Sequence, residues 1–213
     1  MDKIRIPKYT LSEEIINSIT HGIGFLLSIA ALVLCLVKSN TILGVVTTSI
    51  YGSILILLYI ISCIYHALSP DVKGKKVLRV IDHCNVHALV FATYFPIALL
   101  GIKGSFGITM ASIIGLISLL GIIFSAINVD KYSIFSVICH LVSGWSVVIG
   151  YKRLIENIGI NGFNLIILGG IFYTVGSILY MIGAHKKYFH SIFHVFCLLG
   201  SFFHFMCIYL YVV

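Results

Sequence analysis

Two histidines near the C-terminal end of the chain have a spacing that suits metal binding. His190 and His194 are four positions apart, so on an α-helix they lie on one face, about one turn apart. Two imidazoles at this spacing can bind one zinc ion. His66 is the natural third ligand, because it also ends an apolar run. Three histidines and a water molecule form the open arrangement of catalytic zinc sites, whereas structural zinc sites usually have four protein ligands.

Two other polar residues could take part in the same chemistry. Asp82 could accept a hydrogen bond from a metal-bound water or bind the metal directly. Ser62 lies one helical turn before His66, on the same face. The spacing alone leaves two alternatives open, because intramembrane histidines also bridge helices by hydrogen bonds or relay protons. Imidazole also suits copper, nickel and iron, so the metal is left open too.

The elements that must position these groups are apolar. Hydrophobic residues make up 60% of the 213 positions and charged residues 10%, and the mean hydropathy is +1.10. A soluble domain has about 25% charged residues, so this composition indicates an integral membrane protein. Seven runs are long enough to cross a bilayer, and we predict an all-α, seven-transmembrane bundle that forms one domain, 1–213. The runs are 20–37, 41–68, 80–100, 105–128, 133–150, 162–183 and 188–213.

Residues 1–19 are expected to form a cytoplasmic N-terminal segment that includes the start of the first helix, with Ser12 as its N-cap. Pro96 is expected to kink the third span. The net charge is +7, but the basic residues are scattered in short tracts. They do not form the contiguous basic face of a nucleic-acid-binding protein. We therefore expect no nucleic-acid partner.

The distribution of basic residues predicts the orientation in the cell membrane. Ten lysines and arginines fall on the side of the N-terminus and four on the opposite side, which places the N-terminus in the cytoplasm and the C-terminus outside. The ten are Lys3, Arg5, Lys8, Lys73, Lys75, Lys76, Arg79, Lys131, Lys186 and Lys187, and the four are Lys38, Lys103, Lys152 and Arg153.

With this orientation, ionisable groups from four distant runs lie at one membrane depth, toward the cytoplasm. They are His21, His66, Asp82, His83, His87, His190 and His194. Charged and ionisable residues are costly inside a membrane, so their convergence indicates a functional site. His140 and His204 lie deeper, where bridging or pore-lining roles are expected, and His185 reads as a loop residue beside Lys186 and Lys187.

Five motifs between residues 14 and 204 resemble those of the haemolysin III proteins, the bacterial branch of the progestin and adipoQ receptor family. They are Glu14-x-x-Asn17-x-x-Thr20-His21, Ser62-x-x-Tyr65-His66, Asp82-His83, Ala92-Thr93-Tyr94-x-Pro96 and His190-x-x-Phe193-His194, which continues to His204. The resemblance implies a seven-helix fold with a zinc ion near the cytoplasmic face.

By match to these motifs, the zinc ligands are expected to be His66, His190 and His194. Asp82 is the expected partner of the zinc-bound water, with Ser62 as the adjacent hydroxyl. The helical face that carries Glu14, Asn17 and His21 could support the ligands. His87 stands where the family pattern suggests an aromatic residue, so an extra ionisable group or a fourth ligand would border the site.

The wider superfamily includes alkaline ceramidases, so the resemblance favours a zinc-dependent hydrolase of a membrane lipid amide. Asp82 would be the general base and Ser62 would stabilise the oxyanion. A pore-forming or haemolytic membrane protein is one alternative, as the family name suggests. A non-enzymatic regulator of membrane lipid homeostasis with a structural zinc is another. The substrate, the oligomeric state and the roles of His21, His87, His140 and His204 are not fixed by the sequence.

Overall fold

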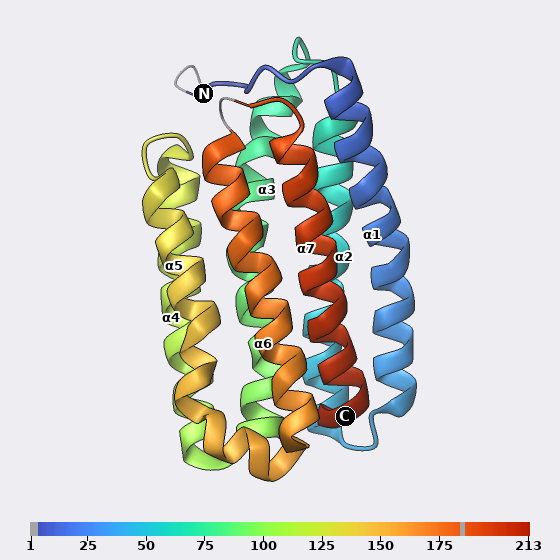
Figure 1. The fold of residues 1–213 in the computed structure, drawn as a ribbon, viewed down its shortest axis with the longest axis vertical. Coiled ribbons are helices and arrows are strands. Elements are labelled where there is room, and N and C mark those ends of the chain that lie inside the picture. The colour runs from blue at the N-terminus through green and yellow to red at the C-terminus, as the bar shows by residue number, and fades with distance from the viewer. Residues whose placement is uncertain (1–3, 184–185) are drawn as a thin grey trace.

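The protein is an up-and-down bundle of α-helices (Figure 1). A computed structural model describes residues 4–183 and 186–213, and in these ranges the ordered elements are all helical. The α-helices are α1 (Leu11–Lys38), α2 (Ile42–Ala67), α3 (Lys73–Pro96), α4 (Gly104–Asn128), α5 (Ser133–Trp145), α6 (Tyr151–Gly183) and α7 (Phe189–Cys207). Short π-helical segments, η1 (Ile97–Ile102) and η3 (Ile208–Val212), follow α3 and α7, and a 3₁₀ segment, η2 (Ser146–Gly150), follows α5.

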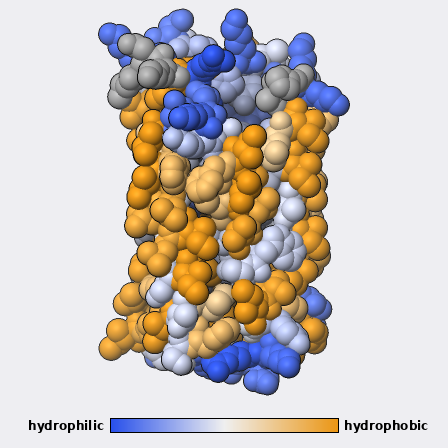
Figure 2. All heavy atoms as spheres, turned by 90° about the vertical axis from the view of Figure 1, so that its left-hand side faces the viewer, coloured by the Kyte–Doolittle hydropathy of each residue, from blue (hydrophilic) through white to orange (hydrophobic). Residues whose placement is uncertain are grey.

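Helix α1 turns mainly small and polar residues inward and apolar residues outward. In α1 the buried positions recur every three or four residues, which places them on one face of the helix. They are Glu13, Asn17, His21, Gly24, Ser28, Ala31 and Cys35. The outward positions of α1 include exposed Leu26, Leu27 and Val37. Figure 2 shows the same on another face, where a broad hydrophobic band separates hydrophilic residues at the two ends. Such a surface is stable in lipid and not in water, so this is an all-α membrane protein.

Within residues 4–183 and 186–213, six continuous helical stretches are long and apolar enough to cross a membrane. One of them, Ser133–Gly183, is 51 residues long and combines α5, η2 and α6. At 1.5 Å per residue such a stretch would extend about 75 Å, more than twice the thickness of the hydrocarbon core. It is not straight: Gly159 has a φ of 70°, outside the helical region, and Figure 1 shows the chain turning back at that end of the bundle.

The first helix begins earlier than predicted. Thr10, not Ser12, is the N-cap of α1, and the expected cap at Ser12 is wrong. The Thr10 hydroxyl accepts from the Glu13 N–H at 3.4 Å, and the Glu13 carboxylate accepts from the Thr10 N–H at 2.8 Å. This reciprocal capping box satisfies two backbone donors that a cap at Ser12 would leave without partners.

Pro96 is the last residue of α3 and keeps helical backbone angles, with φ −64° and ψ −39°, so the kink expected there stays a prediction. The chain continues as η1, where the wider helix turn lets the Lys103 N–H donate to the Ala98 carbonyl at 3.0 Å. Helix α4 packs closely on this carbonyl, because a Cβ atom added at Gly107 would lie 2.2 Å from the Ala98 oxygen. The close approach therefore requires glycine at this position.

We predict that Gly107→Ala lowers the free energy of unfolding by about 1–3 kcal/mol, because the methyl group must push a backbone carbonyl aside. The measurement is thermal unfolding of the protein in detergent. Gly144→Ala is the matched control, since a Cβ at Gly144 meets nothing within 4 Å and alanine favours helix. Equal unfolding temperatures for the two variants would contradict the packing described for α4 and η1.

Candidate metal centre

Three histidines from two helices converge at the end of the bundle where α1 begins. His66 lies in the last turn of α2, and His190 and His194 lie in the first two turns of α7. The Nε2 atoms of His190 and His66 are 3.4 Å apart, and those of His194 and His190 are 3.1 Å apart. Their ligand atoms all lie within 4.8 Å of one another. The structure thus brings together the three residues that the sequence proposes as ligands.

The two Nε2 separations that involve His190 fit a tetrahedral metal ion. With zinc–nitrogen bonds of 2.0–2.1 Å, two ligands of a tetrahedral site lie roughly 3.3 Å apart. The observed Nε2 separations of 3.1 and 3.4 Å lie close to that value. His66 and His194 are buried and His190 is half-buried, so a bound ion would be shielded from bulk water.

Helix α1 fixes the orientation of two of the imidazoles through their other nitrogen. The Nδ1 atom of His66 lies 2.5 Å from the Glu14 carboxylate, and that of His194 lies 3.3 Å from the backbone oxygen of Asn17. Both partners are acceptors, so each Nδ1 carries the proton and each Nε2 offers a lone pair. A carboxylate behind a metal-binding histidine is the usual supporting arrangement, and it makes the imidazole a better ligand.

The same carboxylate joins a third helix to the site. Lys75 of α3 is fully buried, and its ammonium group donates to Glu14 at 2.5 Å and to the backbone oxygen of Leu68 at 2.8 Å. A buried charge of this kind is tolerated only when it is paired. Glu14 is therefore in contact with a basic group on each of two helices.

Aromatic rings cover the triad on two sides. The His21 ring stacks on His194 with centroids 3.6 Å apart, and Tyr9 stacks on His190 at 4.8 Å. The predicted supporting face of Glu14, Asn17 and His21 thus lies against the ligands. The contact of Tyr9 was not predicted, because a tyrosine that precedes a helix carries no periodic signal that would assign its partner.

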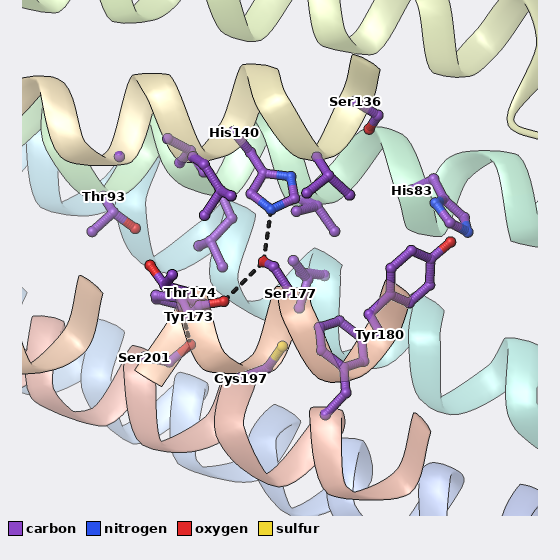
Figure 3. Close-up of a pocket in the computed structure, with 18 of the residues that line it drawn as sticks. His83, Thr93, Ser136, His140, Tyr173, Thr174, Ser177, Tyr180, Cys197 and Ser201 are labelled. Atoms are coloured by element: carbon purple, nitrogen blue, oxygen red, sulfur yellow. Dashed lines mark hydrogen bonds between the residues drawn. The ribbon is translucent and has the colours of Figure 1, made fainter. Parts of the chain in front are cut away.

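A cavity of about 130 Å³ extends from the triad into the bundle between α2, α3, α5, α6 and α7. His190 and His194 line it, and so do Asp82 and Ser62, the proposed general base and hydroxyl. Its wall carries hydroxyl, imidazole and thiol groups among apolar residues (Figure 3). Those labelled there are His83, Thr93, Ser136, His140, Tyr173, Thr174, Ser177, Tyr180, Cys197 and Ser201. Asp82 and Ser62 share this space with the triad, but Asp82 is not in the group of converging ligands.

The remaining histidines have separate partners. His87 lies 2.7 Å from the Ser136 hydroxyl, and its ring packs against Gly121, so it does not join the triad as a fourth ligand. His140 bridges α5 and α6 through the Ser177 hydroxyl at 2.9 Å, and His204 lies 3.1 Å from the backbone oxygen of Ile166. Both therefore bridge helices, as expected for deeper positions. His185 lies outside the described residues.

Comparison with known proteins decides the family. The family description "Haemolysin-III related" matches residues 9–205, which is nearly the whole chain. The chain belongs to the haemolysin III family. It is 36% identical to Hemolysin-3 of Bacillus cereus over 95% of this chain and 93% of that protein. It is 38% identical to the Hemolysin-3 homolog of Bacillus subtilis (strain 168) over 96% and 97% of the two chains.

The match extends more weakly to animal proteins. The human monocyte to macrophage differentiation factor is 24% identical over 96% of this chain and 86% of its own length. The resemblance inferred from the five motifs is thus confirmed at the level of the family. As a haemolysin III protein, the chain places its triad, Asp82 and Ser62 at one end of a membrane bundle.

We predict that Glu14→Gln lowers the affinity for zinc about 10–100-fold, because a neutral amide supports the His66 imidazole less strongly than a carboxylate. The measurement is competition with a zinc chelator in detergent. Glu156→Gln is the control, since Glu156 is exposed and makes the same change of charge elsewhere.

Glu14→Gln also removes the partner of buried Lys75, which could lower affinity by loosening the fold. The double variant Glu14→Gln/Lys75→Met removes the orphaned charge as well. If the double variant is as stable as the unmodified protein and still binds zinc weakly, the effect belongs to the His66 contact. If the double variant binds zinc as tightly as the unmodified protein, the loss of the contact between Glu14 and His66 is not the cause of the weaker binding.

Proposed function

We propose that this haemolysin III protein is a zinc-dependent hydrolase that cleaves the amide bond of a membrane lipid. The observation that supports the proposal is the convergence of three imidazoles, whose ligand atoms lie within 4.8 Å of one another, beside a cavity that is also lined by Asp82 and Ser62. Three protein ligands leave a fourth position for a reacting molecule. Fold and family do not determine an activity, so the argument rests on this site.

A zinc ion bound by the triad would supply a Lewis acid that polarises the amide carbonyl and lowers the pKa of water. Asp82 takes the proton from the attacking water and returns it to the leaving amine nitrogen. The Ser62 hydroxyl donates to the carbonyl oxygen as negative charge develops there. Water and the amide are thereby converted into a carboxylic acid and an amine. The largely apolar cavity holds the acyl chain and keeps bulk water away.

The route of the substrate follows from the position of the cavity. The cavity lies within the bundle between α3, α5, α6 and α7, and lipid surrounds the bundle on its apolar outer face. A lipid that enters sideways between helices would reach the triad without leaving the membrane. The amide would then stop at the depth of the triad, with its chain in the deeper part of the cavity.

We further propose seven membrane spans in the cell membrane, with the N-terminus in the cytoplasm and the C-terminus outside. Figure 1 supports an odd number of crossings, because α1 begins at one end of the bundle and the chain ends at the other. The 51-residue stretch would then contribute two spans, one on each side of the turn near Gly159. The excess of lysine and arginine at the N-terminal end supports the orientation.

Reporter fusions test this topology. We expect a C-terminal alkaline phosphatase fusion to be active and a C-terminal green fluorescent protein fusion to be dark, because the first matures outside the cytoplasm and the second inside it. The same reporters after Ile158, at the predicted outer turn, should behave alike. A fluorescent C-terminal fusion would require an even number of spans and would overturn the assignment.

The enzymatic proposal is tested by metal content and turnover together. We expect about one zinc per chain in the purified protein and its loss in His194→Ala, because two histidines bind zinc far more weakly than three. Asp82→Asn should retain the metal and lose about 10²–10⁴-fold in the rate of ceramide hydrolysis. Asp71→Asn, an exposed acid in the connector before α3, is the control.

The possible outcomes separate the candidate functions. Loss of zinc with loss of folding, and no turnover by any variant, would favour the regulator with a structural zinc. Zinc binding without cleavage of lipid amides, but with dye release from liposomes, would favour the lytic activity that the names of the Bacillus relatives suggest for those proteins. Purified protein that binds no metal would remove the hydrolase mechanism.

A further inference from the structure

A second cavity, of about 730 Å³, lies at the end of the bundle where the metal centre is. The segment before α1, the base of α3, the start of α5 and the end of α6 form its walls. It shares Ser133, Val137 and Tyr180 with the cavity beside the triad, so the two spaces are neighbours across these side chains. Its position makes it the polar mouth of the inner cavity.

The described residues that line this mouth carry an excess of positive charge. Five are cationic and two are acidic, which leaves a surplus of three. The cations are Arg5, Lys8, Arg79, Lys186 and Lys187, and the acids are Glu13 and Asp130. Figure 2 shows hydrophilic side chains gathered at this end of the molecule. The surplus attracts an anion rather than a neutral or cationic ligand.

Both carboxylates are already engaged within the protein. Glu13 accepts from the N–H groups of Thr10 and Tyr188 at 2.8 and 2.7 Å. Asp130 accepts from the Arg79 guanidinium at 2.7 Å and from the Arg5 N–H at 3.1 Å. Burial opposes ionisation of Asp130, but the contact with Arg79 outweighs it and holds the pKa of this carboxyl below its usual value. Asp130 is thus paired with Arg79, and Glu13 keeps its charge near Lys187, so the surplus of three cations remains after both acids are counted.

Arg79 is the strongest indication of a ligand. The residue is only 6% exposed, and one guanidinium nitrogen, Nη2, binds Asp130. The other, Nη1, is buried and has no hydrogen-bond partner among residues 4–183 and 186–213. A buried charged donor without an acceptor is costly, and a phosphate oxygen is an acceptor that suits the Nη1 group while Nη2 stays bound to Asp130.

The orientation signal alone does not account for this arrangement. The excess of cytoplasmic lysine and arginine that orients a membrane protein is satisfied by exposed side chains, such as Lys8 and Lys186. It does not require an arginine to be buried against a cavity with one guanidinium nitrogen unpaired. The buried guanidinium group of Arg79 therefore needs a separate explanation.

We propose that this mouth binds a phosphate group, with Arg79 beneath it and Lys186 and Lys187 around it. A phosphate monoester carries up to two negative charges, which the surplus of three cations can neutralise. The phosphate can belong to the headgroup of a lipid whose chain continues past Val137 into the inner cavity, or it can be free in solution. The site is independent of whether the triad catalyses hydrolysis.

Binding in a neutral detergent tests the proposal with three probes. Lysophosphatidate and the monoacylglycerol of the same chain differ only in the phosphate, and inorganic phosphate lacks the chain. Calorimetry gives the affinities. The single tryptophan, Trp145, lines the inner cavity, so its fluorescence reports entry of the chain. We expect lysophosphatidate to bind at least tenfold more tightly than monoacylglycerol and to change the emission of Trp145.

Three variants locate the phosphate. Lys186→Gln/Lys187→Gln should weaken lysophosphatidate binding by about tenfold or more, because it removes two cations near the ligand. Arg79→Lys keeps the charge beside Asp130 but loses the fork, and we expect a loss of similar size. Lys152→Gln removes an exposed lysine near the start of α6 and should leave binding unchanged. Thermal unfolding verifies that each variant remains folded.

The outcomes distinguish the sources of the phosphate. Equal binding of lysophosphatidate and inorganic phosphate, both weakened by the lysine variant, would support the site and assign it to free phosphate. Equal affinities for lysophosphatidate and monoacylglycerol would overturn the proposal, because they would show that the protein does not recognise the phosphate. So would unchanged affinity in a folded Arg79→Lys variant. Neither result depends on zinc or on turnover, so they are separate from the test of the hydrolase.

Discussion

The contact between Glu14 and its two buried basic partners is the interaction on which the rest of the site depends. One carboxylate oxygen faces the His66 imidazole of α2, and the other accepts from the Lys75 ammonium of α3. Lys75 also binds the carbonyl of Leu68, the residue that caps α2. A carboxylate and an ammonium group are both unstable in an apolar interior unless paired, so the ends of three helices are held in one arrangement.

This arrangement determines how the histidines of α7 can be used. The backbone carbonyl of Asn17 in α1 contacts the His194 imidazole, and the His21 ring of α1 stacks on the same imidazole. Helix α1 therefore orients His194 as well as His66. Imidazoles held by their Nδ1 atoms keep their Nε2 lone pairs directed at one point. A site built on helix ends in this way has little freedom to reorganise, which favours binding of a metal with defined geometry.

Much of the histidine cluster and its supporting face was predictable because it depends on helical periodicity. The four-residue spacing of His190 and His194, and the face shared by Glu14, Asn17 and His21, follow from 3.6 residues per turn. The all-α membrane class follows from composition, and the family from motifs along nearly the whole chain. These features are local or depend on sequence alone, so no knowledge of tertiary contacts was needed.

Other features depend on contacts that periodicity does not encode. Helix α1 begins at a capping box of Thr10 and Glu13, and the nearby Ser12 carries the same type of signal without the reciprocal partner. The sequence analysis used Lys75 and Arg79 only to predict the orientation, yet both residues are buried in ion pairs. Their acidic partners are distant in the sequence, so helical periodicity could not reveal these pairs. His87 was considered as a neighbour of the metal, but its partner is Ser136 of α5.

The shape of the surroundings bears on the choice between an enzyme and a structural metal site. A structural zinc ion is normally enclosed by four protein ligands, and the converging group among the described residues has three. Beside it lies a cavity with hydroxyl and imidazole groups in its walls, and empty space inside a bundle costs packing energy. A site needed only for stability would gain from filling that space with side chains. On the proposals made above, an acyl chain would occupy the cavity between α3, α5, α6 and α7, and the polar group at the end of such a chain would occupy the cationic mouth beside it.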